Sequence, residues 1–261
     1  MSPRATILAL TLAAATSCGP APRSPTPVPA PAPRTYVLVH GAWGGGWAFR
    51  RLDSLLTAAG HVVHRPTLTG LGERAHLARP DVNLTTHVTD VVNLLLFEDL
   101  RDVVLVGHSY GGMVISGVAE RAPERIRHLV FIDAFVPEDG ESVATARGGR
   151  STGLVDRMLA EAKDGMLVPA WVKPETPLPH DVPQPAATFT EPLALRSPAA
   201  RRIPGTYILT VEPAAPEADD PFAPFSRRAK ARGWRHHILA ADHIPERSAP
   251  HPLAALLLGV P

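Results

Sequence analysis

A serine flanked by glycines is the clearest candidate for chemistry in this chain. Gly107-His108-Ser109-Tyr110-Gly111 directly follows an apolar run over residues 103–106 and precedes a helical pattern over 113–121. Such glycines are typical of a nucleophile elbow, because the tight turn from strand to helix leaves no room for side chains beside the serine. The new helix also points unpaired N–H groups at this turn, which favours developing negative charge. We therefore predict Ser109 as a nucleophile.

A serine hydroxyl needs a base to accept its proton, and twelve histidines compete for this role. His243 lies just past the last predicted strand, 236–239, where the order serine, acid, histidine places the base. His236 and His237 fall on that strand, and His251 stands later between prolines. We predict His243 as the general base and structural or solvent-exposed roles for the others.

Two carboxylates could orient this histidine. Asp133 follows the apolar run 129–132, and Glu212 follows the run 206–211. Both strand ends would border the histidine loop, so both positions suit the acid of a Ser-His-acid triad. We favour Asp133 and keep Glu212 as the alternative. If neither served as the acid, Asp133 would bind turn amides and Glu212 would be a surface residue.

Backbone donors for a tetrahedral oxyanion are expected where the first strand ends, at His40-Gly41-Ala42-Trp43. The predicted donors are the N–H groups of Ala42 and Tyr110, and loss of one such donor typically costs about 3 kcal/mol of transition-state stabilisation. The cluster Gly44-Gly45-Gly46 follows and permits close backbone approach.

Alternating strands and helices must position these residues. Short runs that are apolar on both faces suit the central strands of a parallel sheet covered by helices. Helical spacing of apolar residues appears at 52–59, closed by Gly60, and again at 88–96. This alternation predicts an α/β fold with a mostly parallel, doubly wound sheet. The predicted strands are 35–39, 61–65, 103–106, 129–132, 206–211 and 236–239.

The alternation breaks between about residues 137 and 204, where prolines interrupt any periodicity except a helical candidate around 154–161. We interpret this segment as a helical, proline-rich cap inserted over the carboxyl ends of the strands, where doubly wound folds bind ligands. Trp43, Met158 and Trp171 are candidate substrate contacts. Packing between cap and core is the alternative for the two cap residues.

The N-terminal segment has the features of an export signal. Arg4 precedes an apolar stretch that is too short to span a bilayer, which takes about 20 residues. The stretch ends at Cys18, the only cysteine, in a pattern similar to a lipoprotein box. We predict a signal peptide over 1–18, a proline-rich tether over 19–34 and a folded domain over 35–261. Membrane anchoring through a lipidated Cys18 and plain secretory cleavage both remain open, so the protein is expected in the cell envelope or outside the cell.

Composition narrows the class of partner. The 26 basic and 25 acidic residues give a net charge of +1 without a basic stripe, which argues against nucleic acid as a partner. The histidines lack the spacing of metal ligands, and the glycine cluster lacks the lysine of a phosphate loop. We therefore predict neither a metal nor a cofactor.

From about Thr35 onward the chain resembles the α/β-hydrolase superfamily. The resemblance rests on His40-Gly41-Ala42-Trp43, on the glycine-flanked serine and on Asp242-His243. Within the superfamily, the chain is similar to plant methylesterases and hydroxynitrile lyases and to bacterial carboxylesterases, including pyrethroid hydrolases. This resemblance implies a cofactor-free Ser-His-Asp hydrolase that cleaves carboxylic esters. The apolar cap residues favour a small-molecule ester with a hydrophobic part.

The chain departs from these relatives at two positions. They commonly carry an aspartate just after the strand that corresponds to 206–211, whereas Glu212 stands one residue out of register and is followed by Pro213. Hydroxynitrile lyases carry a lysine directly after the catalytic histidine, where this chain has Ile244. The alternatives to an esterase are a lyase of that kind and a ligand-binding relative without turnover.

Overall fold

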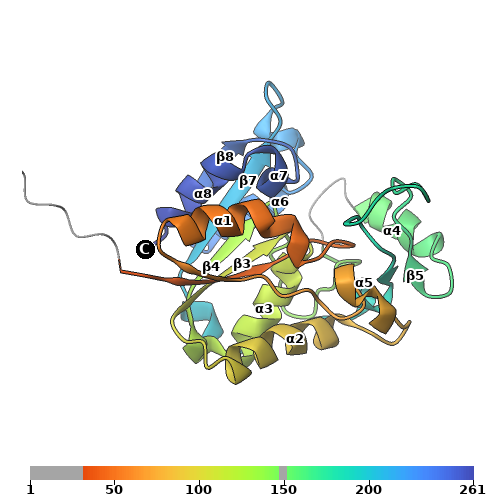
Figure 1. Cartoon of the computed structure of the whole chain (residues 1–261), viewed down its shortest axis with the longest axis horizontal. Helices are drawn as coiled ribbons and strands as arrows, with labels where there is room; N and C mark the ends of the chain where they lie inside the picture. Colours follow the sequence, from red (N-terminus) through yellow and green to blue (C-terminus); the bar gives the residue numbers. More distant parts are fainter. Residues whose placement is uncertain (1–31, 147–151) are drawn as a thin grey trace, which may run out of the picture. The chain divides into compact units, whose positions relative to one another are not determined.

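A six-stranded parallel sheet forms the centre of the molecule (Figure 1). The computed structural model describes residues 32–146 and 152–261. The strand order is β2-β1-β3-β4-β7-β8, with every neighbouring pair parallel. The predicted fold class is confirmed, and five of the six observed strands begin within one residue of the predicted start. The strands are β1 (Thr35–Val39), β2 (Val62–His64), β3 (Val103–His108), β4 (Ile126–Ile132), β7 (Gly205–Val211) and β8 (Arg235–Ala240), of which β4 begins three residues earlier than expected.

Helices cover both faces of this sheet (Figure 1). Alternate residues of β1 enter two different apolar clusters, because successive side chains of a strand point to opposite faces. Tyr36 and Leu38 pack with α1 (Arg50–Ala58) and α8 (Pro250–Leu258). Val37 and Val39 belong to the larger cluster, which includes residues of α2 (Leu84–Phe97), α3 (Gly111–Arg121) and α6 (Ala223–Ala231). Burial on both faces explains why the strands read as continuous apolar runs.

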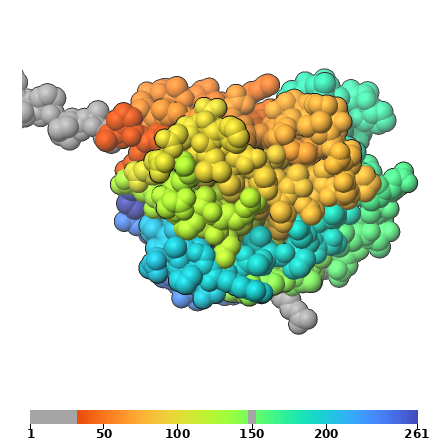
Figure 2. Space-filling model, turned by 90° about the horizontal axis from the view of Figure 1, so that it is seen from below, coloured from red at the N-terminus to blue at the C-terminus, as the bar shows by residue number. Residues whose placement is uncertain are grey.

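The segment between β4 and β7 forms the cap. Its described elements are α4 (Thr152–Ala160), β5 (Met166–Leu167), β6 (Gln184–Pro185), α5 (Ala187–Thr190) and the 3-10 turn η4 (Ala200–Arg202). The helix around 154–161 was predicted, whereas the two-residue antiparallel pair β5-β6 was not, since each strand is too short to show a period. Figure 2 shows the cap, in green to cyan, against the segment around 70–100, in orange to yellow, and Thr85 of α2 donates to Glu191 of the cap over 2.7 Å.

Short elements complete the described chain. They are η1 (Gly46–Phe49), η2 (Gly72–Leu77), η3 (Pro123–Arg125), η5 (Glu217–Asp219) and α7 (Pro245–Ser248). None of the helices in the described ranges has the length and apolar character needed to cross a bilayer. The predicted signal peptide, Cys18 and residues 19–31 of the predicted tether lie outside the described residues, so these predictions stand as made.

Candidate active site

Ser109 occupies a strained turn between β3 and α3. Its φ angle is 52°, in the left-handed region that non-glycine residues rarely adopt. The turn is closely packed: a Cβ added at Gly107 would lie 2.6 Å from the Gly111 carbonyl oxygen, and one at Gly111 would lie 2.6 Å from that of Val39. Only glycine fits at these two positions, as the elbow interpretation predicts. The backbone N–H of Ser109 donates to the Ile132 carbonyl at 3.1 Å, which ties the turn to the end of β4.

Ser109, His243 and Asp133 form one chain of hydrogen bonds. The Ser109 Oγ lies 3.0 Å from Nε2 of His243, and Nδ1 of His243 lies 2.5 Å from Oδ2 of Asp133. Because a carboxylate only accepts, Nδ1 carries a hydrogen, and Nε2 is left to accept the proton of Ser109. The three side chains therefore meet in the order that a nucleophile, a base and an orienting acid require.

Asp133 is fixed on all sides at the end of β4. It is 1% exposed, has a φ angle of 43°, and its backbone N–H donates to Ile208 at 2.8 Å. Its other carboxylate oxygen, Oδ1, accepts from the Thr210 N–H at 3.3 Å. The alternative acid, Glu212, is exposed beyond the end of β7. The structure thus brings Asp133, and not Glu212, to His243.

Three acidic side chains act on the pKa of His243. Burial by itself lowers this pKa, but the hydrogen bond to Asp133 and the charges of Asp133, Glu246 and Asp220 outweigh it, so the pKa is raised above its usual 6.5. Asp220 is affected in turn, since its partial burial and the neighbouring Asp133 raise its pKa to about 6. The field around His243 therefore favours the imidazolium that forms when a base accepts a proton.

Two aromatic groups flank the imidazole of His243. The ring of Phe222 stacks on it with centroids 4.8 Å apart, and the ring of His108 lies 4.9 Å away on a tilted plane. His108 is buried, and its Nε2 donates to the His243 carbonyl oxygen over 2.6 Å. Both contacts restrict the orientation of the loop that carries the base.

A buried acid lies behind His108. Glu246, in α7, is 2% exposed, and its Oε1 lies 3.4 Å from Nδ1 of His108. Its Oε2 has no hydrogen-bond partner among the described residues. Burial lowers the pKa of His108, an effect that the charge of Glu246 partly offsets. Gly41, in the loop after β1, leaves little room for a side chain beside His108, because a Cβ added there would lie 3.0 Å from Nδ1 of His108.

Among the described residues, the two predicted oxyanion donors have no protein acceptor. Within the described ranges, no hydrogen bond leaves the backbone N–H of Ala42 or of Tyr110. Trp43, directly after Ala42, has a φ angle of 61°. Trp43, Ser109 and Asp133 are therefore all left-handed, and strain of this kind is concentrated at functional sites.

The predicted substrate contacts are only partly brought together. Trp43 and Trp171 meet edge to face with centroids 5.0 Å apart, and Nε1 of Trp171 donates to Asp181 over 2.8 Å. Trp171 is 54% exposed, so part of its ring is open to a ligand. Met158, on α4, packs against the main apolar cluster, which is the packing alternative considered for it.

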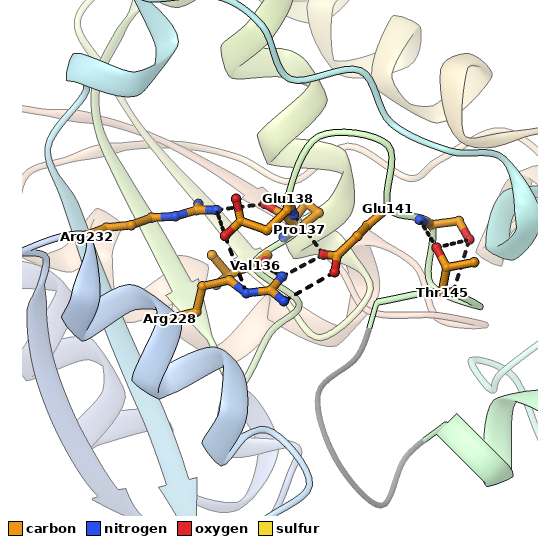
Figure 3. Close-up of polar contacts among 8 residues, drawn as sticks. Val136, Pro137, Glu138, Glu141, Thr145, Arg228 and Arg232 are labelled. Carbon is orange, nitrogen blue, oxygen red and sulfur yellow. Dashed lines mark hydrogen bonds and ion pairs between the residues drawn. The ribbon is translucent and has the colours of Figure 1, made fainter.

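The loop after Asp133 is held by Arg228 of α6 and by Arg232, which directly follows that helix (Figure 3). Arg228 donates to the Val136 carbonyl and to Glu141, both at 2.6 Å. Arg232 donates to the Pro137 carbonyl at 2.8 Å and to Glu138 at 2.9 Å. These bonds begin three residues after Asp133 and hold the chain where it leaves the site for the cap.

Several contributors to the site carry no local signal in the sequence. Glu246 and Phe222 reach His243 through tertiary packing, and Gln184 of β6 accepts from the Trp43 N–H. Gln184 is the only glutamine in the chain, but its surroundings are proline-rich and aperiodic. In the described part of the chain, no group of three or more His, Cys, Asp or Glu side chains is arranged to hold a metal ion.

Known proteins with similar sequences include esterases, a binding protein and an alpha-hydroxynitrile lyase. The chain is 57% identical over 108 residues to a carbendazim hydrolyzing esterase from Nocardioides, and 39% identical over 106 residues to salicylic acid-binding protein 2 from Nicotiana tabacum. These matches cover 41% and 40% of this chain. They cover 45% and 40% of the two relatives, so the chain matches less than half of the length of either.

Comparison of structures extends the likeness over nearly the whole fold. An extracellular alpha/beta-hydrolase from a Paenibacillus species superposes with a TM-score of 0.72 at 27% identity, covering 87% of this chain and 98% of that one. The model of the alpha/beta hydrolase family matches residues 36–256. The chain therefore belongs to the alpha/beta hydrolase family.

Proposed function

We propose that the protein is a serine esterase that cleaves small carboxylic esters with a hydrophobic part. The observation that carries the proposal is the unbroken chain of hydrogen bonds from Ser109 through His243 to the buried Asp133. The similarity to a carbendazim hydrolyzing esterase supports the same chemistry, with a match that covers 45% of that esterase.

In the proposed cycle, the Ser109 oxygen attacks the ester carbonyl while its proton passes to Nε2 of His243. Asp133 holds the Nδ1–H side of the ring and stabilises the imidazolium. The carbonyl oxygen becomes an oxyanion that accepts hydrogen bonds from the N–H groups of Ala42 and Tyr110. Among the described residues, neither of these two N–H groups has a protein acceptor, so both are free to bind the oxyanion.

Collapse of the tetrahedral intermediate then breaks the bond to the alcohol oxygen, which takes the proton from His243. A water molecule attacks the acyl-enzyme, gives its proton to His243 and releases the acid, after which Ser109 recovers its proton. No redox step or cofactor enters this sequence, and the reaction consumes one water for each ester cleaved.

The substrate's hydrophobic part is proposed to lie against the aromatic cluster of Trp43, Trp171 and Phe189. The rings of Trp43 and Phe189 lie 5.7 Å apart, next to the edge-to-face contact of Trp43 with Trp171. Aromatic faces bind flat or branched apolar groups and contribute large contact areas.

The test is labelling by a fluorophosphonate together with turnover of p-nitrophenyl esters for wild type, Ser109→Ala and His243→Ala. We expect both labelling and turnover to disappear in Ser109→Ala and turnover to fall strongly in His243→Ala. A folded wild-type protein that neither labels nor turns over would contradict the proposal and favour a ligand-binding relative.

A further inference from the structure

All three polar groups of Trp43 are bound by the cap. Its backbone N–H donates to Oε1 of Gln184 at 2.7 Å, and its carbonyl accepts from the Val182 N–H at 2.9 Å. Its indole Nε1 donates to the Leu167 carbonyl at 3.0 Å. The residue that follows the expected oxyanion donor Ala42 is therefore held by a segment that lies about 140 residues further along the chain.

Gln184 is itself held in place. It is fully buried, and its Nε2 donates to Thr188 Oγ1 at 2.8 Å, while that hydroxyl donates to the Pro185 carbonyl at 2.6 Å. Gln184 also stands opposite Leu167 in the β5-β6 pair, so the two residues that bind the N–H groups of Trp43 are direct neighbours. A buried amide with both ends bonded has a single orientation.

The same part of the cap contacts the second expected donor. Phe189 of α5 lies 5.7 Å from the Trp43 ring and 5.6 Å from the Tyr110 ring, on which it stacks at an interplanar angle of 6°. The segment 184–189 thus touches both residues around the expected oxyanion hole, one at the end of β1 and the other at the elbow.

We propose that Gln184 is a positioning residue of the oxyanion hole, which fixes the Ala42–Trp43 turn from the cap. This proposal rests on the proposed esterase function. The strained φ of Trp43 requires support from its surroundings, and the bond from its N–H to Gln184 supplies that support. Without it, the turn relaxes and the Ala42 N–H no longer points at the developing oxyanion.

Such a role predicts a selective loss. An oxyanion donor acts on the tetrahedral state much more than on the bound ester, so a displaced donor lowers kcat and leaves KM nearly unchanged. A displaced donor also weakens the binding of a trifluoromethyl ketone inhibitor, because the adduct of this ketone with serine carries the oxyanion. The displaced donor should not weaken the binding of the carboxylic acid product, because this product lacks a tetrahedral centre.

The experiment compares wild type with Gln184→Met, which keeps the side-chain length but cannot bond to the Trp43 N–H. We expect kcat to fall at least about tenfold, within the range for a misplaced donor, with KM changed less than about twofold. The inhibition constant of the trifluoromethyl ketone should rise by the same factor as kcat falls. Thr190→Ala, at the exposed end of the neighbouring helix α5, is the matched control and should behave as wild type.

Hydrogen exchange of the peptide that spans Val39–Gly44 gives a readout independent of activity. Gln184→Met should exchange faster there than wild type. Thr188→Val, which releases only the far end of Gln184, should show a smaller change in the same direction, and serves if Gln184→Met does not fold. Unchanged exchange, or a folded Gln184→Met with wild-type kcat, would overturn the proposal. If Gln184→Met exchanges faster but the wild-type protein has no esterase activity, the positioning role of Gln184 is upheld and the proposed function is contradicted.

Discussion

The ends of β4 and β7 each present a carboxylate near the histidine loop, but only the carboxylate at the end of β4 binds His243. At the end of β4, Asp133 is buried, left-handed and bonded to His243 and Thr210. At the end of β7, Glu212 is exposed and followed by a proline. A triad acid must be held where its charge and geometry act on the histidine. A position at the end of a neighbouring strand is therefore not sufficient for the acid, and anchoring of the backbone selects Asp133.

Removal of the β4 carboxylate should have the largest effect. Asp133→Asn keeps the shape but presents an amide to His243, which favours the wrong tautomer of the ring. We expect kcat to fall about 10⁴-fold, measured with a p-nitrophenyl ester. The melting temperature should be followed alongside, and a folded variant with turnover near that of wild type would break the assignment of Asp133.

Removal of the Arg228 bonds to the loop after Asp133 should have an intermediate effect. Arg228→Met removes the donors to the Val136 carbonyl and to Glu141 and so loosens the loop after β4. We expect the free energy of unfolding to fall by about 2 kcal/mol and the melting temperature by roughly 5 °C. The kcat should fall by about an order of magnitude, since Asp133 loses its fixed position.

Arg227, the exposed neighbour of Arg228 on the same helix, offers the matched control. Arg227→Met should leave both the melting temperature and kcat unchanged, because exposed substitutions away from such networks rarely matter. An equal loss of kcat and melting temperature in both arginine variants would show that the bonds of Arg228 have no specific effect on Asp133.

A smaller effect is expected from neutralising Glu246, the buried acid beside His108. The charge of Glu246 helps to raise the pKa of His243, so Glu246→Gln should lower that pKa. A base works only when it is unprotonated, so the acidic limb of kcat/KM should move to lower pH, by less than about one unit. Glu124→Gln, at an exposed position, should not move it. A limb that stays in place or moves to higher pH would contradict this view.

The smallest effect should come from substitution of Glu212 at the end of β7. Glu212→Gln should change neither kcat nor the pH profile by more than about twofold, because its side chain is exposed and has no bond to His243 in the described structure. Strong loss of turnover in Glu212→Gln, with Asp133→Asn active, would reverse the comparison and place the acid at β7.

Much of the fold followed from the sequence because buried parallel strands have a distinct pattern. The run at 35–39 is apolar on both faces, and it forms β1 with alternate residues in two clusters. The elbow around Ser109 was predictable for a steric reason, since Gly107 and Gly111 are required by close backbone contacts. Local pattern and local sterics were enough for these parts of the molecule.

Contacts that arise only after folding could not be predicted. Asp133 was favoured over Glu212 from the sequence, but the choice could not be made firm because it depends on burial. Gln184 meets Trp43 only because two short strands pair within an aperiodic cap. Glu246 reaches the site beside His108, which contacts both Glu246 and the His243 carbonyl from the end of β3. No periodicity or spacing marks such residues, since each acts through a partner distant in sequence.

The most direct test of the account is the intact mass of the protein during turnover of p-nitrophenyl acetate, quenched in acid after a few milliseconds. We predict a species heavier by one acetyl group, with the modification on Ser109 in peptide maps and none in Ser109→Ala. Steady turnover by a folded protein without any acyl adduct, or an adduct on another residue, would contradict the assignment of Ser109 as the nucleophile.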